Sequence, residues 1–149
     1  MKAVVRLRVL EHGLGLEVPR RQSAGASCVD LRAAVAEDVT LPAGRWAAIP
    51  SGVALAVPQW LEAQVRSRSG LALRDGVFVM NSPGTIDSDY RGEIVVVLAN
   101  LSSVDFMVRR GDRIAQLAFC RVERPILELV AELDETERGS EGLGSTGKK

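Results

Sequence analysis

Apolar and polar residues alternate along several short stretches of this chain. The alternation is clearest at residues 5–9 and 61–66, where every second side chain is apolar. A period of two predicts β-strands with one buried face. The apolar stretch 46–57 is interrupted by Pro50-Ser51-Gly52, which predicts two short strands joined by a bend. Apolar runs predict further strands at residues 77–80, 94–98, 113–120 and 126–133.

Turn residues separate these predicted strands at short intervals. They occur at Pro42-Ala43-Gly44, Asp75-Gly76 and Arg110-Gly111-Asp112. One segment, from Gly70 to Arg74, favours a short helix, whereas the length and flanks of the alanine-rich residues 33–36 argue against a helix there. Many short strands with regular turns predict an all-β sandwich or barrel with one short helix.

Composition is that of one ordinary globular domain. The chain has 149 residues, and 46% of them are hydrophobic, which is enough for a core. Lys+Arg and Asp+Glu balance at 19 each, which argues against a broad nucleic-acid or membrane surface. No apolar run approaches the roughly 18 residues that cross a bilayer, and the first residues lack the apolar block of a signal peptide. We expect a soluble, cytoplasmic protein with no nucleic-acid or membrane partner.

Soft metal ligands are few. Cys28 and Cys120 are far apart and belong to no Cys-x-x-Cys pair, and His12 is the only histidine. Structural zinc is therefore not expected, and any metal is more consistent with a hard cation bound by oxygen. We expect both cysteines to be reduced core residues and His12 to lie on the surface.

The most informative segment is the loop between the strands predicted at 77–80 and 94–98. It reads Asn81-Ser82-Pro83-Gly84-Thr85-Ile86-Asp87-Ser88-Asp89-Tyr90-Arg91-Gly92-Glu93, with turn residues throughout. A hairpin of this kind can form the floor of a pocket. Its backbone can read the edge of a flat ligand, Tyr90 can close over a sugar, and Asp87 can hold a water molecule.

Three other motifs carry weaker signals, each with a structural alternative. Arg68 can bind phosphate in a bidentate manner with Ser69 and Gly70 beside it, but a charged strand end explains the same residues. Gln116 lies among apolar neighbours and is either a ligand-binding residue or an outward-facing one. Asp30 needs a partner, which is either an arginine in a structural ion pair or a hydrated metal.

The last segment, residues 138–149, differs in composition from the rest. It has four glycines and one large apolar side chain, Leu143, so it cannot offset its ordering entropy and should be mobile until a ligand or partner holds it. Residues 142–148 match most of a phosphate-binding loop, but Lys149 replaces the Ser or Thr and no helix follows, which argues against a Walker site. Its backbone N–H groups can still surround phosphates.

Five segments, taken in chain order, resemble the five motifs of the trimeric deoxyuridine triphosphatase (dUTP diphosphatase) family. They are the segment around Asp30, Arg68-Ser69-Gly70, residues 84–93, residues 111–116 and the last segment from Arg138. The resemblance runs from about Ser23 to the C-terminus and is most specific at residues 84–93 and 111–116. It implies a distorted jelly-roll or β-clip-like barrel subunit in a homotrimer. Residues 1–137 would form the β domain, and residues 138–149 an exchanged arm that completes a neighbouring subunit's active site.

The resemblance also implies Mg²⁺-dependent hydrolysis of dUTP to dUMP and pyrophosphate, which limits uracil incorporation into DNA and supplies dUMP for dTMP synthesis. Asp87 would orient the attacking water and accept its proton. Asp30 would contact Mg²⁺ through water rather than directly. Tyr90 would pack against the deoxyribose and exclude a ribose 2′-hydroxyl.

The resemblance assigns the other candidate residues to substrate binding. The hairpin residues Asn81, Thr85 and Ile86 would read uracil, and Leu143 would cover the base. The phosphate chain would be contacted by Arg68, Ser69, Gly70, Gln116, Arg138, Gly144, Ser145 and Thr146.

The fifth motif departs from the family pattern Gly-Gly-Phe-Gly, because Glu141-Gly142-Leu143-Gly144 stands in its place. Leu143 cannot stack on the base as an aromatic ring does, and Glu141 brings a negative charge close to the polyphosphate. Two alternatives stay open: a dCTP deaminase of the same superfold, and a catalytically weak, nucleotide-sensing relative.

Overall fold

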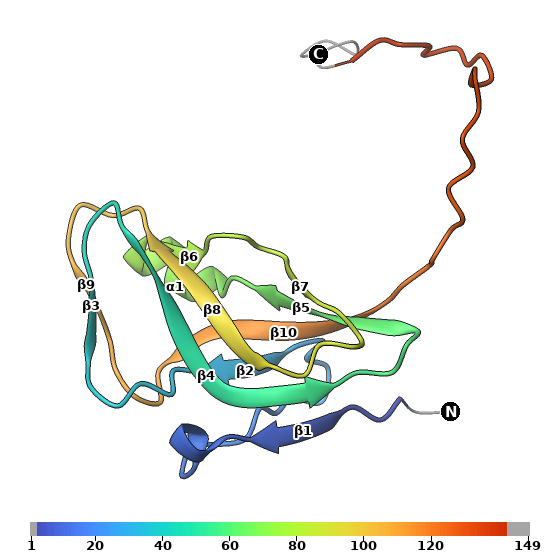
Figure 1. Cartoon of the computed structure of the whole chain (residues 1–149). Helices are drawn as coiled ribbons and strands as arrows, with labels where there is room; N and C mark the ends of the chain where they lie inside the picture. Colours follow the sequence, from blue (N-terminus) through green and yellow to red (C-terminus); the bar gives the residue numbers. More distant parts are fainter. Residues whose placement is uncertain (1–2, 143–149) are drawn as a thin grey trace.

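Two four-stranded antiparallel sheets pack face to face in the computed structural model, which describes residues 3–142 (Figure 1). The first sheet has the order β1 (Arg6–Val9), β4 (Trp46–Ala56), β8 (Glu93–Asn100) and β6 (Val77–Val79). The second has the order β2 (Val29–Arg32), β10 (Arg113–Arg121), β5 (Leu61–Arg66) and β7 (Gly84–Ile86). A third sheet pairs β3 (Val39–Leu41) with β9 (Phe106–Val108) at one end. The predicted all-β class is confirmed.

Two short helical segments accompany the sheets. The helix α1 (Ser69–Asp75) follows β5 and ends at Gly76, whose left-handed backbone (φ 65°) closes it. The prediction of one short α-helix in this place is confirmed. A 3₁₀ turn, η1 (Glu11–Gly13), follows β1.

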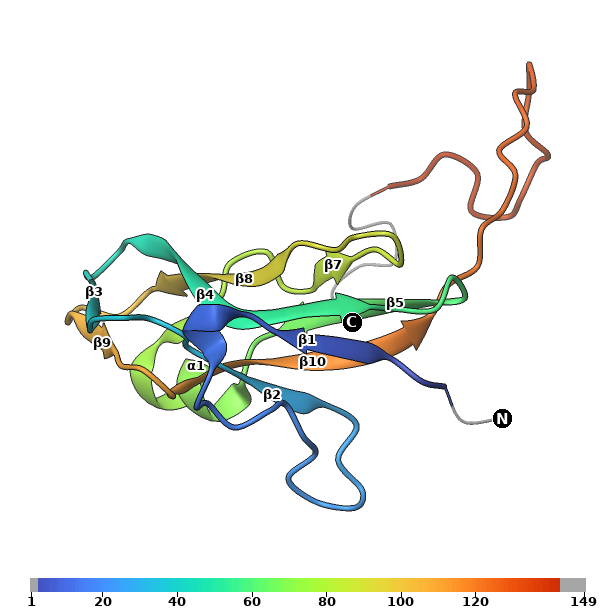
Figure 2. The same ribbon diagram turned by 60° about the horizontal axis from the view of Figure 1, so that its bottom comes forward.

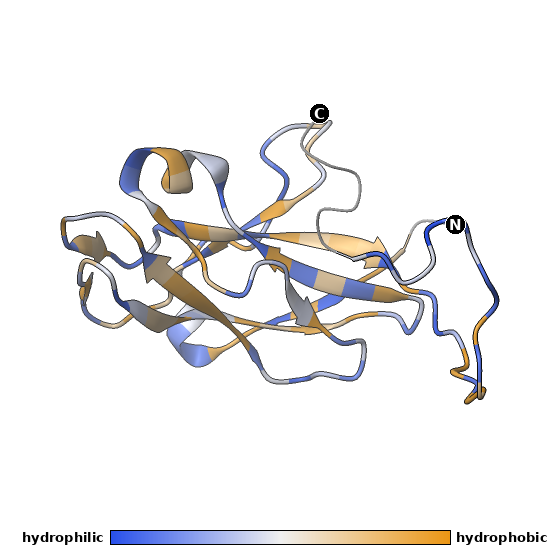
Figure 3. Cartoon of the chain, turned by 90° about the horizontal axis from the view of Figure 1, so that it is seen from above, coloured by the Kyte–Doolittle hydropathy of each residue, from blue (hydrophilic) through white to orange (hydrophobic). Residues whose placement is uncertain are grey.

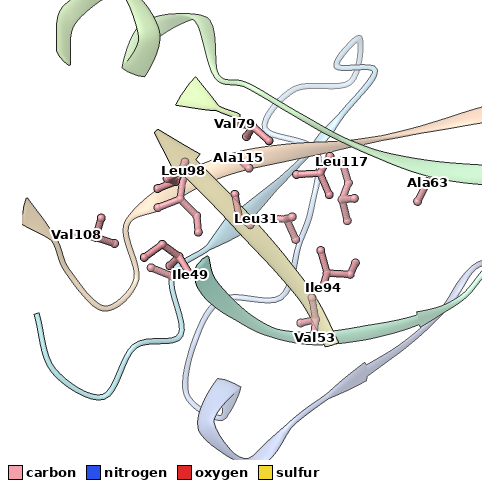
Figure 4. Close-up of a cluster of buried hydrophobic side chains, with 14 of the residues drawn as sticks. Leu31, Ile49, Val53, Ala63, Val79, Ile94, Leu98, Val108, Ala115 and Leu117 are labelled. Atoms are coloured by element: carbon pink, nitrogen blue, oxygen red, sulfur yellow. The ribbon is translucent and has the colours of Figure 1, made fainter. Parts of the chain in front are cut away.

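The hydrophobic core lies between the two large sheets. Each sheet contributes its inward-facing side chains, because alternate residues of β5 and β8 are buried as a period of two requires. Figure 4 shows this cluster, in which Leu31, Ile49, Ile94 and Leu117 are at most 1% exposed. Burial of such side chains contributes roughly 1.5–3 kcal/mol each. This core gives the sites at the sheet edges a rigid support.

The outward side of the first sheet is apolar as well, and we call it the outer apolar face. Its residues are neighbours across strands, because Trp46 pairs with Ala99, Ala48 with Val97 and Pro50 with Val95. A sheet that covers one core normally alternates apolar-in with polar-out. Trp46 is 60% exposed and Val95 is 44% exposed in this single chain. The residues of the outer apolar face are Trp46, Ala48, Pro50, Phe78, Val95, Val97 and Ala99.

The apolar stretch 46–57 forms one strand, so the prediction of two short strands was wrong. The interruption at residues 50–52 is real but local. Five residues of β4, from Pro50 to Ala54, lie opposite three residues of β8, from Val95 to Glu93. A bulge of this kind bends a strand and increases its twist without ending it.

The predicted strand at 126–133 was also wrong, because residues 122–142 contain no strand. This segment leaves the end of β10 and extends away from the sheets (Figure 1), and hydropathy colouring shows apolar residues along it (Figure 3). Ile126, Leu127 and Leu129 are all more than 90% exposed. The alternating pattern is that of a strand, but a strand also needs a partner for its backbone groups, and residues 3–142 offer none there.

Both cysteines are free thiols, as predicted, but they are half-buried rather than part of the core. His12 lies on the surface, as predicted, with its side chain 43% exposed. No helix in residues 3–142 is long and apolar enough to span a membrane.

Candidate active site

A cavity of about 460 Å³ opens where β2, β10 and the start of α1 meet. Its walls also include residues of the long loop before β2, which projects from the sheets in Figure 2. Five residues that the sequence singled out in three separate motifs line this cavity together: Asp30, Arg68, Ser69, Gly70 and Gln116. The fold therefore brings residues of these three motifs together around one cavity.

The register of the strands explains why these cavity-lining residues lie close together. Gln116 in β10 lies opposite Asp30 in β2 on one side and opposite Arg66 in β5 on the other. The chain leaves β5 at Arg66, so Arg68 and the first turn of α1 follow directly at the cavity. Gln116 donates from Nε2 to the carbonyl oxygen of Ser67 at 2.9 Å, which fixes its amide at the cavity wall.

Two guanidinium groups flank the carboxylate of Asp30. Arg68 Nε lies 3.4 Å from Asp30 Oδ1, and Arg113 Nη1 lies 3.3 Å from Oδ2. Arg68 also donates to the carbonyl oxygen of Arg113 at 2.9 Å. With a side chain only 13% exposed, Asp30 has the arginine partners that its position requires. The cavity thus has two cations against one anion, which favours an anionic ligand.

Sequence reasoning missed Arg113. The residue lies in the motif Gly111-Asp112-Arg113-Ile114-Ala115-Gln116, and its side chain lines the same cavity as Gln116. A register shift in β10 between Arg113 and Ala115 breaks the simple alternation that would assign their faces. The motif itself indicates that Arg113 is a candidate site residue. Whether its side chain faces the cavity depends on the register shift, which the sequence pattern does not reveal.

Beside the cavity, hydrogen bonds from Arg20 and Arg32 hold the pKa of the Glu17 carboxyl below its ordinary value. Arg32, two residues after Asp30 in β2, also donates to the carbonyl oxygen of Gly111 at 2.9 Å. These contacts tie the loop before β2 to the turn before β10.

The acid-bearing hairpin is a second group of candidate residues. Its β7 pairs with β5, with Ile86 opposite Ala63, and the turn after it carries Asp87 and Tyr90 on the surface. The Tyr90 hydroxyl donates to the carbonyl oxygen of Glu93 at 2.9 Å, and its N–H donates to Asp87 O at 3.2 Å. Within residues 3–142 the carboxylate of Asp87 makes no hydrogen bond or ion pair.

These two groups do not meet within one chain. None of the hairpin residues Asn81, Thr85, Ile86, Asp87 and Tyr90 lines the cavity. The order β2-β10-β5-β7 puts Asp30 and the hairpin at opposite edges of the sheet. Three strand spacings separate these edges, which amounts to about 14 Å.

Of the candidate residues near the C-terminus, only Arg138 lies within the described residues. Arg138 is exposed, and its Nε donates to the carbonyl oxygen of Glu141 at 3.1 Å rather than to any group of the cavity. Leu143, Gly144, Ser145 and Thr146 lie outside the described residues.

Metal ligands are sparse in the described part of the chain, where no three His, Cys, Asp or Glu side chains cluster. Asp30 offers carboxylate oxygens at the cavity, but both arginines already contact them. This donor set fits a hydrated Mg²⁺ held mainly by ligand oxygens and water, as Mg²⁺ commonly is. It does not fit a metal bound tightly by protein alone.

The fold and the cavity define a class: a β-sandwich protein with a cationic pocket that favours an anionic ligand and with a separate surface acid. A sequence profile of the dUTPase family matches residues 15–147. A deoxyuridine 5'-triphosphate nucleotidohydrolase of Neorickettsia sennetsu is 49% identical over 147 residues, 99% of each chain. One of Brucella melitensis is 51% identical over 93% of this chain and 89% of its own, and one of Maricaulis maris is 48% identical over 97% of both. The chain belongs to the dUTPase family.

Solved structures agree on the fold. A dUTPase of phage 80alpha superposes with a TM-score of 0.86 at 23% identity, over 97% of this chain and 99% of that one. A dUTPase of phage phi11 of S. aureus, described with a structural Mg(II) ion, superposes with a TM-score of 0.79 at 21% identity, over 89% of this chain and 99% of that one. Family membership and these names favour dUTP hydrolysis over the dCTP deaminase alternative.

Proposed function

We propose that this chain hydrolyses dUTP to dUMP and pyrophosphate, with Asp87 as the group that activates water. The observation that carries the proposal is the carboxylate of Asp87, exposed on a hairpin fixed by β7 and without a protein partner in residues 3–142. The water oxygen attacks the α-phosphorus in line, the bond from that phosphorus to the bridging oxygen breaks, and pyrophosphate leaves. Asp87 accepts the proton of the attacking water.

Nucleotide selection belongs to the same hairpin. Tyr90 packs against the deoxyribose, and its ring leaves the 2′-hydroxyl of a ribonucleotide neither space nor a hydrogen-bond partner. Rejection of an added hydroxyl by packing alone reaches only about 100-fold, so a fixed ring position is needed. Asn81, Thr85 and Ile86 supply the amide and backbone groups that read uracil.

The cavity binds the phosphate chain. Arg68 and Arg113 provide charge-assisted hydrogen bonds, while Ser69, Gln116 and the backbone at Gly70 add neutral donors. Negative charge accumulates on the departing pyrophosphate, and these donors stabilise it. When bound, Mg²⁺ neutralises phosphate charge further, with Asp30 accepting hydrogen bonds from its water shell.

A homotrimer brings the two groups of residues together. The hairpin and the cavity lie at opposite edges of one sheet, so a hairpin of a neighbouring copy completes each cavity. The outer apolar face is the contact surface for that assembly, because an apolar sheet side of this kind is stable when a second copy covers it. The extended segment 122–142, which includes Arg138, reaches toward a neighbouring copy.

Pyrophosphate release tests the reaction. Wild type should release pyrophosphate from dUTP in preference to UTP, dTTP and dCTP, and Asp87→Asn should lower kcat by at least about 100-fold, as loss of a general base does. Asp89→Asn, two residues away on the same exposed turn, is the matched control and should keep near wild-type activity. Ammonia release from dCTP, or full activity of Asp87→Asn, would contradict the proposal.

Mixed oligomers test the composite site. Asp87→Asn and Gln116→Leu should each be inactive alone. Co-expressed in equal amounts, they should regain about a quarter of wild-type activity, since each site draws its hairpin and its cavity from different copies of a closed oligomer. Activity that stays at the level of the single variants would show that both groups come from one chain.

A further inference from the structure

His12, the one histidine of the chain, makes a contact that the proposed reaction does not use. Its Nε2 lies 2.8 Å from Oε1 of Glu93, although 81 positions separate the two residues. The same carboxylate oxygen accepts the backbone N–H of Gly52 at 2.7 Å. Glu93 therefore joins three elements at one point: η1, the bulge of β4 and the start of β8.

Close backbone packing fixes this point. The N–H of Leu10 donates to the carbonyl oxygen of Gly52 at 2.8 Å, and a Cβ on Gly13 would overlap the backbone of Gly52. Gly52 has φ 69°, in the left-handed region that favours glycine. Two glycines in contact let η1 lie directly on the bulge. This places the His12 ring within hydrogen-bond distance of Glu93.

The backbone of Glu93 leads on to the ring that contacts the sugar. The hydroxyl of Tyr90 donates to the carbonyl oxygen of Glu93 at 2.9 Å. The ring also lies close over Gly92, where a Cβ would come within 2.6 Å of Tyr90 Cζ. A displacement of Glu93 therefore displaces the ring of Tyr90.

We infer that the His12–Glu93 contact positions the nucleotide-selecting hairpin. His12 donates to the carboxylate of Glu93, this carboxylate holds the bulge at Gly52, and the start of β8 then holds the ring of Tyr90. His12 and Glu93 are positioning residues, since neither lines the phosphate cavity. The inference rests on the proposed sugar-packing role of Tyr90.

Two substitutions at one position separate a hydrogen-bond role from a packing role. In His12→Gln the amide nitrogen can take nearly the place of imidazole Nε2, whereas His12→Met has a similar length and no donor. We expect His12→Met to lower the dUTP-to-UTP ratio of kcat/KM by about fivefold, through a higher KM for dUTP with kcat within about twofold. His12→Gln should retain the wild-type ratio, as should Glu11→Gln, a control in the same 3₁₀ turn.

¹⁹F NMR reports on the environment of the Tyr90 ring independently of enzyme activity. Tyr90 is the only tyrosine of the chain, so 3-fluorotyrosine labelling gives a single ¹⁹F resonance. His12→Met should shift or broaden that resonance, whereas His12→Gln and Glu11→Gln should not. The double variant His12→Met/Glu93→Met should be no worse than Glu93→Met, because both changes remove one interaction.

The possible outcomes are distinct. An unchanged resonance and an unchanged nucleotide ratio in His12→Met would overturn the inference. It would also be overturned if His12→Met lowered the Tm and reduced kcat/KM equally for dUTP and UTP, because that is a purely structural effect. A shifted resonance with unchanged selectivity would support the His12–Glu93 tie and contradict the role of Tyr90 in sugar selection.

Discussion

At the scale of single residues, Asp30 shows how a charge acquires its function from its neighbours. The sequence left two partners open for it, an arginine or a hydrated metal. The structure places Arg68 and Arg113 within 3.4 Å of its two oxygens. Both arginines also line the cavity, so the phosphates that we propose there would compete with Asp30 for the same donors. A ligand that drew the arginines away would leave Asp30 available to water.

Arg113→Gln tests this competition. Arg113 is 43% exposed, so loss of its ion pair should lower the free energy of unfolding by less than about 1 kcal/mol. Loss of a charged phosphate donor should cost more, about tenfold in KM for dUTP. Steady-state kinetics and thermal unfolding measure the two effects. Arg109→Gln, which removes an exposed pair with Asp38, is the control and should change neither by much.

At the scale of elements, the segment from β6 to β8 contributes strands to both large sheets. The prediction of strands on both sides of the loop is confirmed, and β6 pairs directly with β8. The loop between them adds β7 to the other sheet, which no sequence pattern indicated. The acid-bearing turn is therefore attached to both layers, and Gly92 allows the Tyr90 ring to fold back onto it.

Gly92→Ala is expected to disturb this turn. The added Cβ would lie within 2.6 Å of Tyr90 Cζ, so the ring must move. Because small misplacements in a site have large kinetic costs, kcat/KM for dUTP should fall by about tenfold or more. In the control Gly25→Ala the new Cβ meets no atom within 4 Å. Equal kinetics for the two variants would show that the ring position is unimportant.

At the scale of the whole molecule, two surfaces remain uncovered in the single chain. One is the outer apolar face of the first sheet, and the other is the extended segment from residue 122, with Ile126, Leu127 and Leu129 exposed. Both are costly to leave in water. The proposed assembly would cover both surfaces, and it would also account for the division of the site.

Val97→Lys should prevent assembly. Val97 lies at the centre of the outer apolar face, opposite Ala48, and a buried unpaired ammonium costs several kcal/mol. Light scattering after gel filtration should show a trimer for wild type and dissociation for Val97→Lys at the same concentration, with dUTP hydrolysis lost in parallel. Val104→Lys, on a surface loop where the side chain is 67% exposed, should remain trimeric and active. A trimeric Val97→Lys would place the interface elsewhere.

The sequence by itself determined the strand periods, the short helix, the all-β class and most of the candidate residues. These depend on local patterns, because periodicity and turn chemistry act over a few neighbouring positions. Only the tertiary structure decided that Arg113 faces Asp30, that β4 continues through its bulge and that residues 126–133 form no strand. The tertiary structure also shows that the hairpin and the cavity lie at opposite edges of one sheet. Such features depend on pairing between distant segments, and register and sheet order arise only when those segments pack around a shared core.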